Sequence, residues 1–245
     1  MLSITLLLQA GSGGSPLLRY SFVALAFFVA ALVVAAVGWS AAIAGNDRSR
    51  WTRHTLIAAV VAAAWMAATG FAAARGLLHF AAPPTMLIVF PAVLVGAVAL
   101  ALSPVGTRIT RALPLAALVG FQGFRVLVEL LLHRAYTEGL MPVQMSYAGR
   151  NFDIVSGATA IGVAAWLATG HVAPRLVLAW NVVSAALLAN IVIVALLSAP
   201  TPMRVFLNEP SNVWITRAPW VWLPTVMVFA AVTGHVMVFR RLRMP

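Results

Sequence analysis

Long apolar blocks alternate with short polar connections along the whole chain. Each block is long enough for a helix that crosses a hydrocarbon core of about 30 Å, which takes roughly 20 apolar residues. The pattern therefore predicts an all-α integral membrane protein, a bundle of seven transmembrane helices in one domain (residues 20–245) after an external N-terminal tail (residues 1–19). The predicted helices are residues 20–44, 55–80, 85–102, 113–134, 152–170, 176–197 and 219–239.

Arginines mark one side of this bundle. Nine of them fall in alternate connections and at the C-terminus, whereas Glu138, Asp153 and Glu209 fall in or beside the other connections. Cytoplasmic connections carry an excess of positive charge. We therefore expect the N-terminus outside and the C-terminus in the cytoplasm, although Arg19 before the first helix is a contrary mark. The nine are Arg48, Arg50, Arg53, Arg108, Arg111, Arg175, Arg240, Arg241 and Arg243.

The composition agrees with a lipid environment. Of the 245 residues, 62% are hydrophobic and 9% are charged, which fits a multi-pass protein of a cell membrane, such as a bacterial inner membrane. The net charge of +11 does not indicate nucleic-acid binding, because the arginines lie singly or in small groups beside apolar blocks. The chain has no cysteine and no lysine, which excludes disulfides, thiolate metal sites and a lysine Schiff base.

The fourth predicted helix carries charges within the membrane. Arg125, Glu129 and His133 are spaced at i, i+4 and i+8 and so share one stripe of the helix. Ionisable groups at this depth face the bundle interior and are functional candidates by default. The alternative is structural: Arg125 and Glu129 neutralise each other, and His133 lies at the interface.

Histidines and carboxylates near the external side permit a metal or a haem. His79, Glu129 and His133 are candidate ligands for zinc or another first-row metal. A b-type haem is a second possibility, held by His79 and His133 or by a pair among the remaining histidines. Those are His54, His171 and His235. Neither cofactor is required by the sequence, and interfacial histidines are the ordinary alternative.

Two long external connections flank this region. In the first, residues 135–151, the segment MSYAGRNFD brings together Arg150, Asn151 and Asp153 at the start of the fifth helix. Asn151 or Asp153 is suited to cap that helix, and the helix start together with Arg150 is also suited to contact an anion.

The second connection, residues 198–218, is rich in proline and aromatic residues. It is interpreted either as an interfacial anchor, since tryptophan prefers the headgroup level, or as an ordered lid with Asn208 and Glu209 pointing inward. The tryptophans in or beside it are Trp214, Trp220 and Trp222.

These features together predict a polar cavity that faces the extracytoplasmic side and binds a small anionic molecule, in a transporter or a sensor. Two alternatives stay open: a membrane-embedded enzyme, metal-dependent or not, that acts on a lipid-like substrate, with Glu129 or Asp153 as general base, and a structural subunit of a membrane complex. A homo-oligomer is compatible with each. The predicted ligand-binding residues are Arg125, Glu129, His133, Arg150, Asn151, Asp153 and Glu209.

Overall fold

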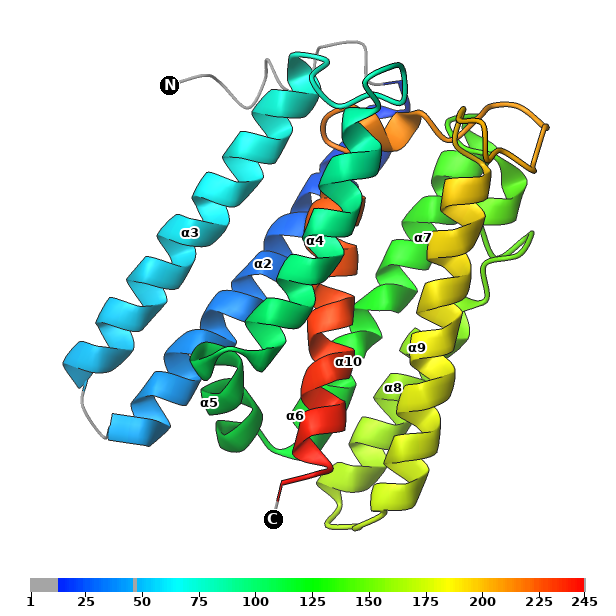
Figure 1. Cartoon of the computed structure of the whole chain (residues 1–245). Helices are drawn as coiled ribbons and strands as arrows, with labels where there is room; N and C mark the ends of the chain where they lie inside the picture. The colour runs from blue at the N-terminus through cyan, green and yellow to red at the C-terminus, as the bar shows by residue number, and fades with distance from the viewer. Residues whose placement is uncertain (1–12, 46–47, 245) are drawn as a thin grey trace.

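The computed structural model describes residues 13–45 and 48–244, and all regular structure in this part of the chain is helical (Figure 1). The main helices are α2 (Pro16–Gly45), α3 (Arg48–Ala74), α4 (Thr85–Leu102), α5 (Pro104–Ala112), α6 (Leu115–Gly120), α7 (Phe124–Thr137), α8 (Asp153–Ala168), α9 (Pro174–Leu197) and α10 (Phe229–Arg241). Shorter turns are η1 (Phe121–Gly123), η2 (Val143–Met145), η3 (Trp214–Thr216) and the π-helical η4 (Leu223–Val228).

Six segments of the described chain are long and apolar enough to cross a membrane, as expected for a helical membrane protein. The predicted span 152–170 corresponds to α8, which has only 16 residues. At 1.5 Å per residue its length is about 24 Å, less than a core of about 30 Å. The six are Pro16–Ile43, Ser49–Ala74, Thr85–Leu102, Leu115–Thr137, Pro174–Leu197 and Leu223–Arg241.

Two connections differ from the sequence prediction. α3 begins at Arg48, so the three arginines that the sequence assigns to the first connection lie on the first turns of this helix. The helix ends before Gly76, whose φ of +66° does not fit a right-handed helix. The connection after α4 contains the amphipathic helix α5, which Ser103 caps by accepting the backbone N–H of Gly106 at 3.2 Å.

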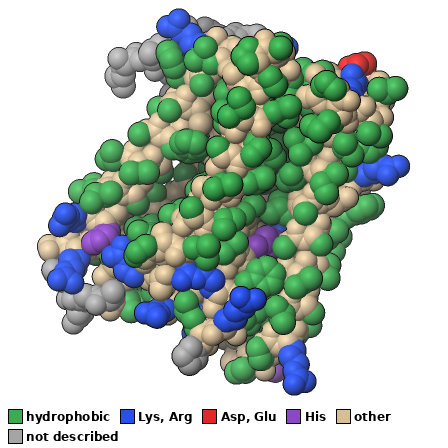
Figure 2. Space-filling view, viewed as in Figure 1, with side chains coloured by type: hydrophobic (Ala, Val, Ile, Leu, Met, Phe, Trp, Pro, Cys, Tyr) green, Lys and Arg blue, Asp and Glu red, His purple; other side chains and the backbone are tan. Residues whose placement is uncertain are grey.

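α10 occupies the centre of the bundle, and α3 stands at its periphery beside α2 (Figure 1). Arginine side chains gather at the end where the α2–α3 connection, α5 and the C-terminus lie (Figure 2). The chain thus has a basic end, on the side that the sequence assigns to the cytoplasm.

Trp214, Trp220 and Trp222 are all buried within the protein. Trp220 packs edge-to-face on Phe22 with ring centroids 5.0 Å apart. The indole N–H of Trp222 donates to the carbonyl of Met66 at 3.1 Å, which removes the usual cost of burying it. These rings join the segment before η4 to α2 and α3.

The connection between α7 and α8 enters the bundle. Asp153, the first residue of α8, pairs with Arg125, which lies halfway along the Leu115–Thr137 span. α8 therefore begins at mid-depth. Its close approach to α7 depends on Gly157, where an added Cβ would lie 2.7 Å from the backbone nitrogen of Val126.

Candidate functional site

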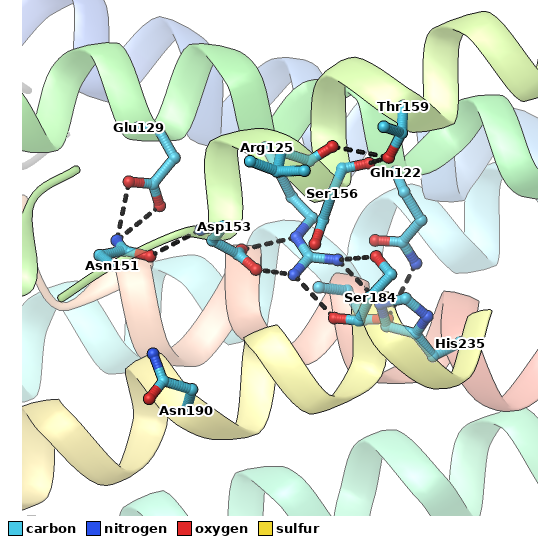
Figure 3. Close-up of polar contacts among 12 residues, drawn as sticks. Gln122, Arg125, Glu129, Asn151, Asp153, Ser156, Thr159, Ser184, Asn190 and His235 are labelled. Carbon is cyan, nitrogen blue, oxygen red and sulfur yellow. Dashed lines mark hydrogen bonds and ion pairs between the residues drawn. The ribbon is translucent and has the colours of Figure 1, made fainter. Parts of the chain in front are cut away.

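A buried polar network surrounds Arg125, whose side chain is only 2% exposed (Figure 3). Its Nε donates to Asp153 Oδ2 at 2.6 Å, and its Nη2 donates to Asp153 Oδ1. Nη2 also donates to the carbonyl of Ser184 at 3.3 Å, and Nη1 donates to Ser184 Oγ at 3.0 Å. The second hydrogen of Nη1 points to His235 Nε2 at 2.8 Å. All five donors of the guanidinium are therefore satisfied by the protein.

His235 extends this network to α10. Arginine can only donate, so His235 Nε2 is an acceptor and the ring proton resides on Nδ1. Nδ1 lies 2.8 Å from Asn181 Oδ1, and Asn181 Nδ2 donates to the His235 carbonyl at 3.2 Å. Asn181 and Ser184 lie three residues apart on α9, so both face this network. The arrangement fixes the histidine in one tautomer.

The expected pairing of Arg125 with Glu129 is wrong. Glu129 instead accepts from Asn151 Nδ2, which lies 2.7 Å from each carboxylate oxygen. Spacing at i, i+4 permits contact within a helix, but the bidentate geometry offered by Asp153 is the stronger partner for a guanidinium. Glu129 is 1% exposed, and no ion pair among the described residues includes it.

Asn151 connects Glu129 to the start of α8. Its Oδ1 accepts the backbone N–H of Asp153 at 3.1 Å, and its Nδ2 also donates to the Met145 carbonyl at 3.0 Å. The expectation that Asn151 or Asp153 caps α8 is wrong, because the N-cap residue is Phe152 and no side chain caps the helix. Asn151 forms an Asx turn just before it, while the Asp153 side chain bonds Arg125. One asparagine thus sets both the turn into the bundle and the orientation of the Glu129 carboxylate.

A cavity of about 80 Å³ lies beside Glu129. Its walls are mostly apolar side chains of α4, α7, α9 and η4, including Met86, Phe90, Leu188, Ile191 and Leu223. Its polar lining consists of Glu129, Asp153 and Asn212. The Oδ1 of Asn212 is buried without a hydrogen-bond partner. The cavity therefore presents hydrogen-bond acceptors in an apolar wall.

The other predicted site residues lie outside this cavity. His133 stacks on Tyr147 with ring centroids 4.3 Å apart, and Arg150 lies over the ring of Phe206 at 5.4 Å. Glu209 is exposed and pairs with Arg204 at 2.9 Å, so it does not point inward as expected. The hydrogen bond from Arg204 holds the pKa of Glu209 below its ordinary value. Asn208 is exposed as well, although its Nδ2 donates to Gln144 Oε1 at 2.8 Å.

The predicted metal ligands are not brought together. Among the described residues, no three His, Asp or Glu side chains cluster as metal ligands. His79 Nδ1 lies 3.1 Å from the Ala81 carbonyl, which is a local contact. Of the histidines considered for haem, His235 is held by Arg125 and Asn181, and His171 stacks on Trp166.

Sequence reasoning missed His235, a member of the network, and Gln122, a buried residue that bonds to α10. His235 was noted only as a haem candidate, although a lone histidine within an apolar span is itself a signal of a buried polar partner. Gln122, whose Nε2 donates to the Ala231 carbonyl at 3.0 Å, was overlooked. It lies one turn before Arg125, on the same side of the helix, and this spacing was the available signal.

Residues 82–243 match the family described as Domain of unknown function (DUF8737), and the chain belongs to this family. The matched region includes every member of the network and the cavity walls from α4 onward. Neither a curated protein nor a solved structure matches the chain.

Proposed function

We propose that this membrane protein binds a small, largely apolar molecule in the cavity beside Glu129, as a transporter or a sensor. One observation carries the proposal: a buried carboxylate with only an amide partner lies in the wall of an apolar cavity. A buried carboxylate without a cation is costly to keep, so it favours a functional use over a purely structural one.

The geometry changes the ligand expected from the sequence. An anion would need free donors, but the guanidinium of Arg125 has none to spare. The polar residues that line the cavity are Glu129, Asp153 and Asn212, and the Oδ1 of Asn212 is buried without a hydrogen-bond partner. The ligand that complements them has an apolar body and a hydrogen-bond donor or a positive charge.

The cavity walls also suggest a route of entry. α4 and α9 both contribute apolar side chains to the walls of the cavity. A ligand that entered between them would come from the bilayer, which suits an apolar molecule. The same apolar lining favours a second candidate function, an enzyme that acts on a lipid-like substrate with Glu129 as general base.

We further propose seven crossings with the N-terminus outside. The seventh crossing would combine α8 with the segment that precedes it, because non-helical backbone is tolerated at membrane depth when it is buried in protein. The arginines at one end (Figure 2) and the position of the loop after α9, which carries the exposed Glu209, at the other end (Figure 1) support this orientation. Reporter fusions after Arg108, Arg175 and Arg243 should all be cytoplasmic, and an external signal from any of them would contradict the topology.

The ligand proposal is tested by what co-purifies with the protein. Ala195→Phe places a ring in the cavity wall, whereas Ile193→Phe adds the same ring at a position of α9 that is 54% exposed. Mass spectrometry of molecules extracted from purified protein should find a species that wild type and Ile193→Phe retain. Ala195→Phe and Glu129→Gln should lose it. Chemical conversion of that species by wild type would favour the enzyme.

If Ala195→Phe retains every co-purified species at the wild-type level, this cavity is not the binding site. An anionic species that depends on Ala195 but not on Glu129 would refute the assigned ligand class.

A further inference from the structure

α2 and α3 enclose a second space, separate from the cavity at Glu129. It has a volume of about 490 Å³ and lies between the facing sides of the two helices, where alanines such as Ala31, Ala35, Ala59 and Ala63 leave room. Near its basic end the two helices approach closely, since a Cβ on Gly38 would collide with Thr55. We call this space the α2–α3 gap.

The length of the gap matches one leaflet. Its lining on α2 extends from Phe27 to Trp39, which are twelve helical steps or about 18 Å apart, and half of a hydrocarbon core is about 15 Å. Trp39 is 58% and Trp51 is 44% exposed at the basic end of the gap. Tryptophans at this level are typical of the boundary between acyl chains and headgroups.

Positive charge lies at the same end. Arg108 of α5 donates from Nη1 to His54 Nε2 of α3 at 3.2 Å, while its buried Nε has no hydrogen-bond partner. Arg53, one residue before His54, is exposed. Four acidic residues lie in the described part of the chain. Glu129 and Asp153 belong to the network, Glu138 bonds to Ser15, and Glu209 lies in the loop after α9. The fifth, Asp47, falls outside the described residues.

We propose that the α2–α3 gap binds an anionic phospholipid. One acyl chain would fill the alanine-lined space, and the phosphate would contact Arg108 and the first turns of α3. Basic pockets between membrane helices suit such headgroups. Lipid is the occupant that the charge, the leaflet length and the tryptophans favour together. The proposal does not rest on the cavity at Glu129, and the gap precedes the residues matched by the family.

The test measures lipid-dependent stability of the full chain in an uncharged detergent. Phosphatidylglycerol and phosphatidylcholine with identical acyl chains are titrated while the melting temperature is followed. Wild type should be stabilised by both, and more by phosphatidylglycerol. Arg108→Gln should abolish that excess and keep the phosphatidylcholine shift, whereas Arg175→Gln, an exposed arginine on α9, should behave like wild type.

Filling the gap should have a different effect. Ala59→Phe should abolish both shifts, whereas Ile57→Phe, at a position of α3 that is 53% exposed, should abolish neither. Native mass spectrometry counts bound phosphatidylglycerol directly, so Arg108→Gln tests the proposal even where Ala59→Phe does not fold.

Three results would overturn the proposal. The first is equal stabilisation of wild type by the two lipids, and the second is an unchanged phosphatidylglycerol excess in Arg108→Gln. The third is a wild-type dimer that Ala59→Phe converts to a monomer without any change in bound lipid, because a second copy would then occupy the gap.

Discussion

Replacing Asp153 with asparagine isolates the contribution of charge to the buried network. The substitution preserves size and one acceptor oxygen, but it removes the negative charge that faces Arg125. Two of the five guanidinium donors point at this carboxylate. After the change, one of them would face an amide N–H, and the positive charge would remain buried without a bidentate partner.

The size of the effect follows from this geometry. Removing one member of a buried ion pair costs about 3–5 kcal/mol, because the remaining charge is uncompensated. We expect the lower end of this range, about 3 kcal/mol, since Ser184 and His235 retain the other three hydrogen bonds of the guanidinium. In a chain of this length that loss lowers the melting temperature by roughly 6–12 °C.

Tryptophan fluorescence during thermal unfolding in detergent measures this effect. The double variant Arg125→Met with Asp153→Leu removes both charges, so it should recover most of the stability that Asp153→Asn loses. If Asp153→Asn melts with wild type, the ion pair does not hold α8 in place. If the double variant is no more stable than the single one, shape and not charge determines the loss.

Further predictions concern helix packing and pH. Gly157→Ala should destabilise the fold by about 1–3 kcal/mol, because its Cβ would press on Val126. Gly162→Ala is the control, since a Cβ at that position meets nothing within 4 Å. Thermal melts of both variants test this difference in stability. Burial tends to raise the pKa of Glu138, but hydrogen bonds led by those from Ser15 outweigh it and lower the pKa below 4.5. The stability from these bonds is present above pH 4.5 and is lost as pH falls through the lowered pKa. Ser15→Ala should therefore flatten the acid side of a plot of melting temperature against pH. An unchanged plot would refute the link between these hydrogen bonds and acid stability.

Hydropathy predicted the spans well because bilayer thickness constrains helix length more strongly than any single contact. Residues 85–102 form α4 with both boundaries as expected. α8 is different, because an apolar segment of similar composition begins at mid-depth only when the loop before it finds partners inside the bundle.

The site was predictable in its residue types but not in its pairings. Arg125, Glu129, Asn151 and Asp153 were all singled out, yet the actual ion pair joins residues 28 positions apart. Helical spacing provides information only about neighbours within one helix. Which carboxylate reaches the guanidinium depends on how closely α8 approaches α7, and Gly157 sets that distance through tertiary packing.

The mid-depth start of α8 constrains the biogenesis of the protein. α7 does not enter lipid alone without cost, since a charge such as Arg125 disfavours insertion by about 2.5–3.5 kcal/mol at the centre of a helix. That cost falls when Asp153 of α8 pairs with Arg125. During synthesis α7 therefore has to wait beside the insertion machinery until α8 emerges, so that the two helices leave it together.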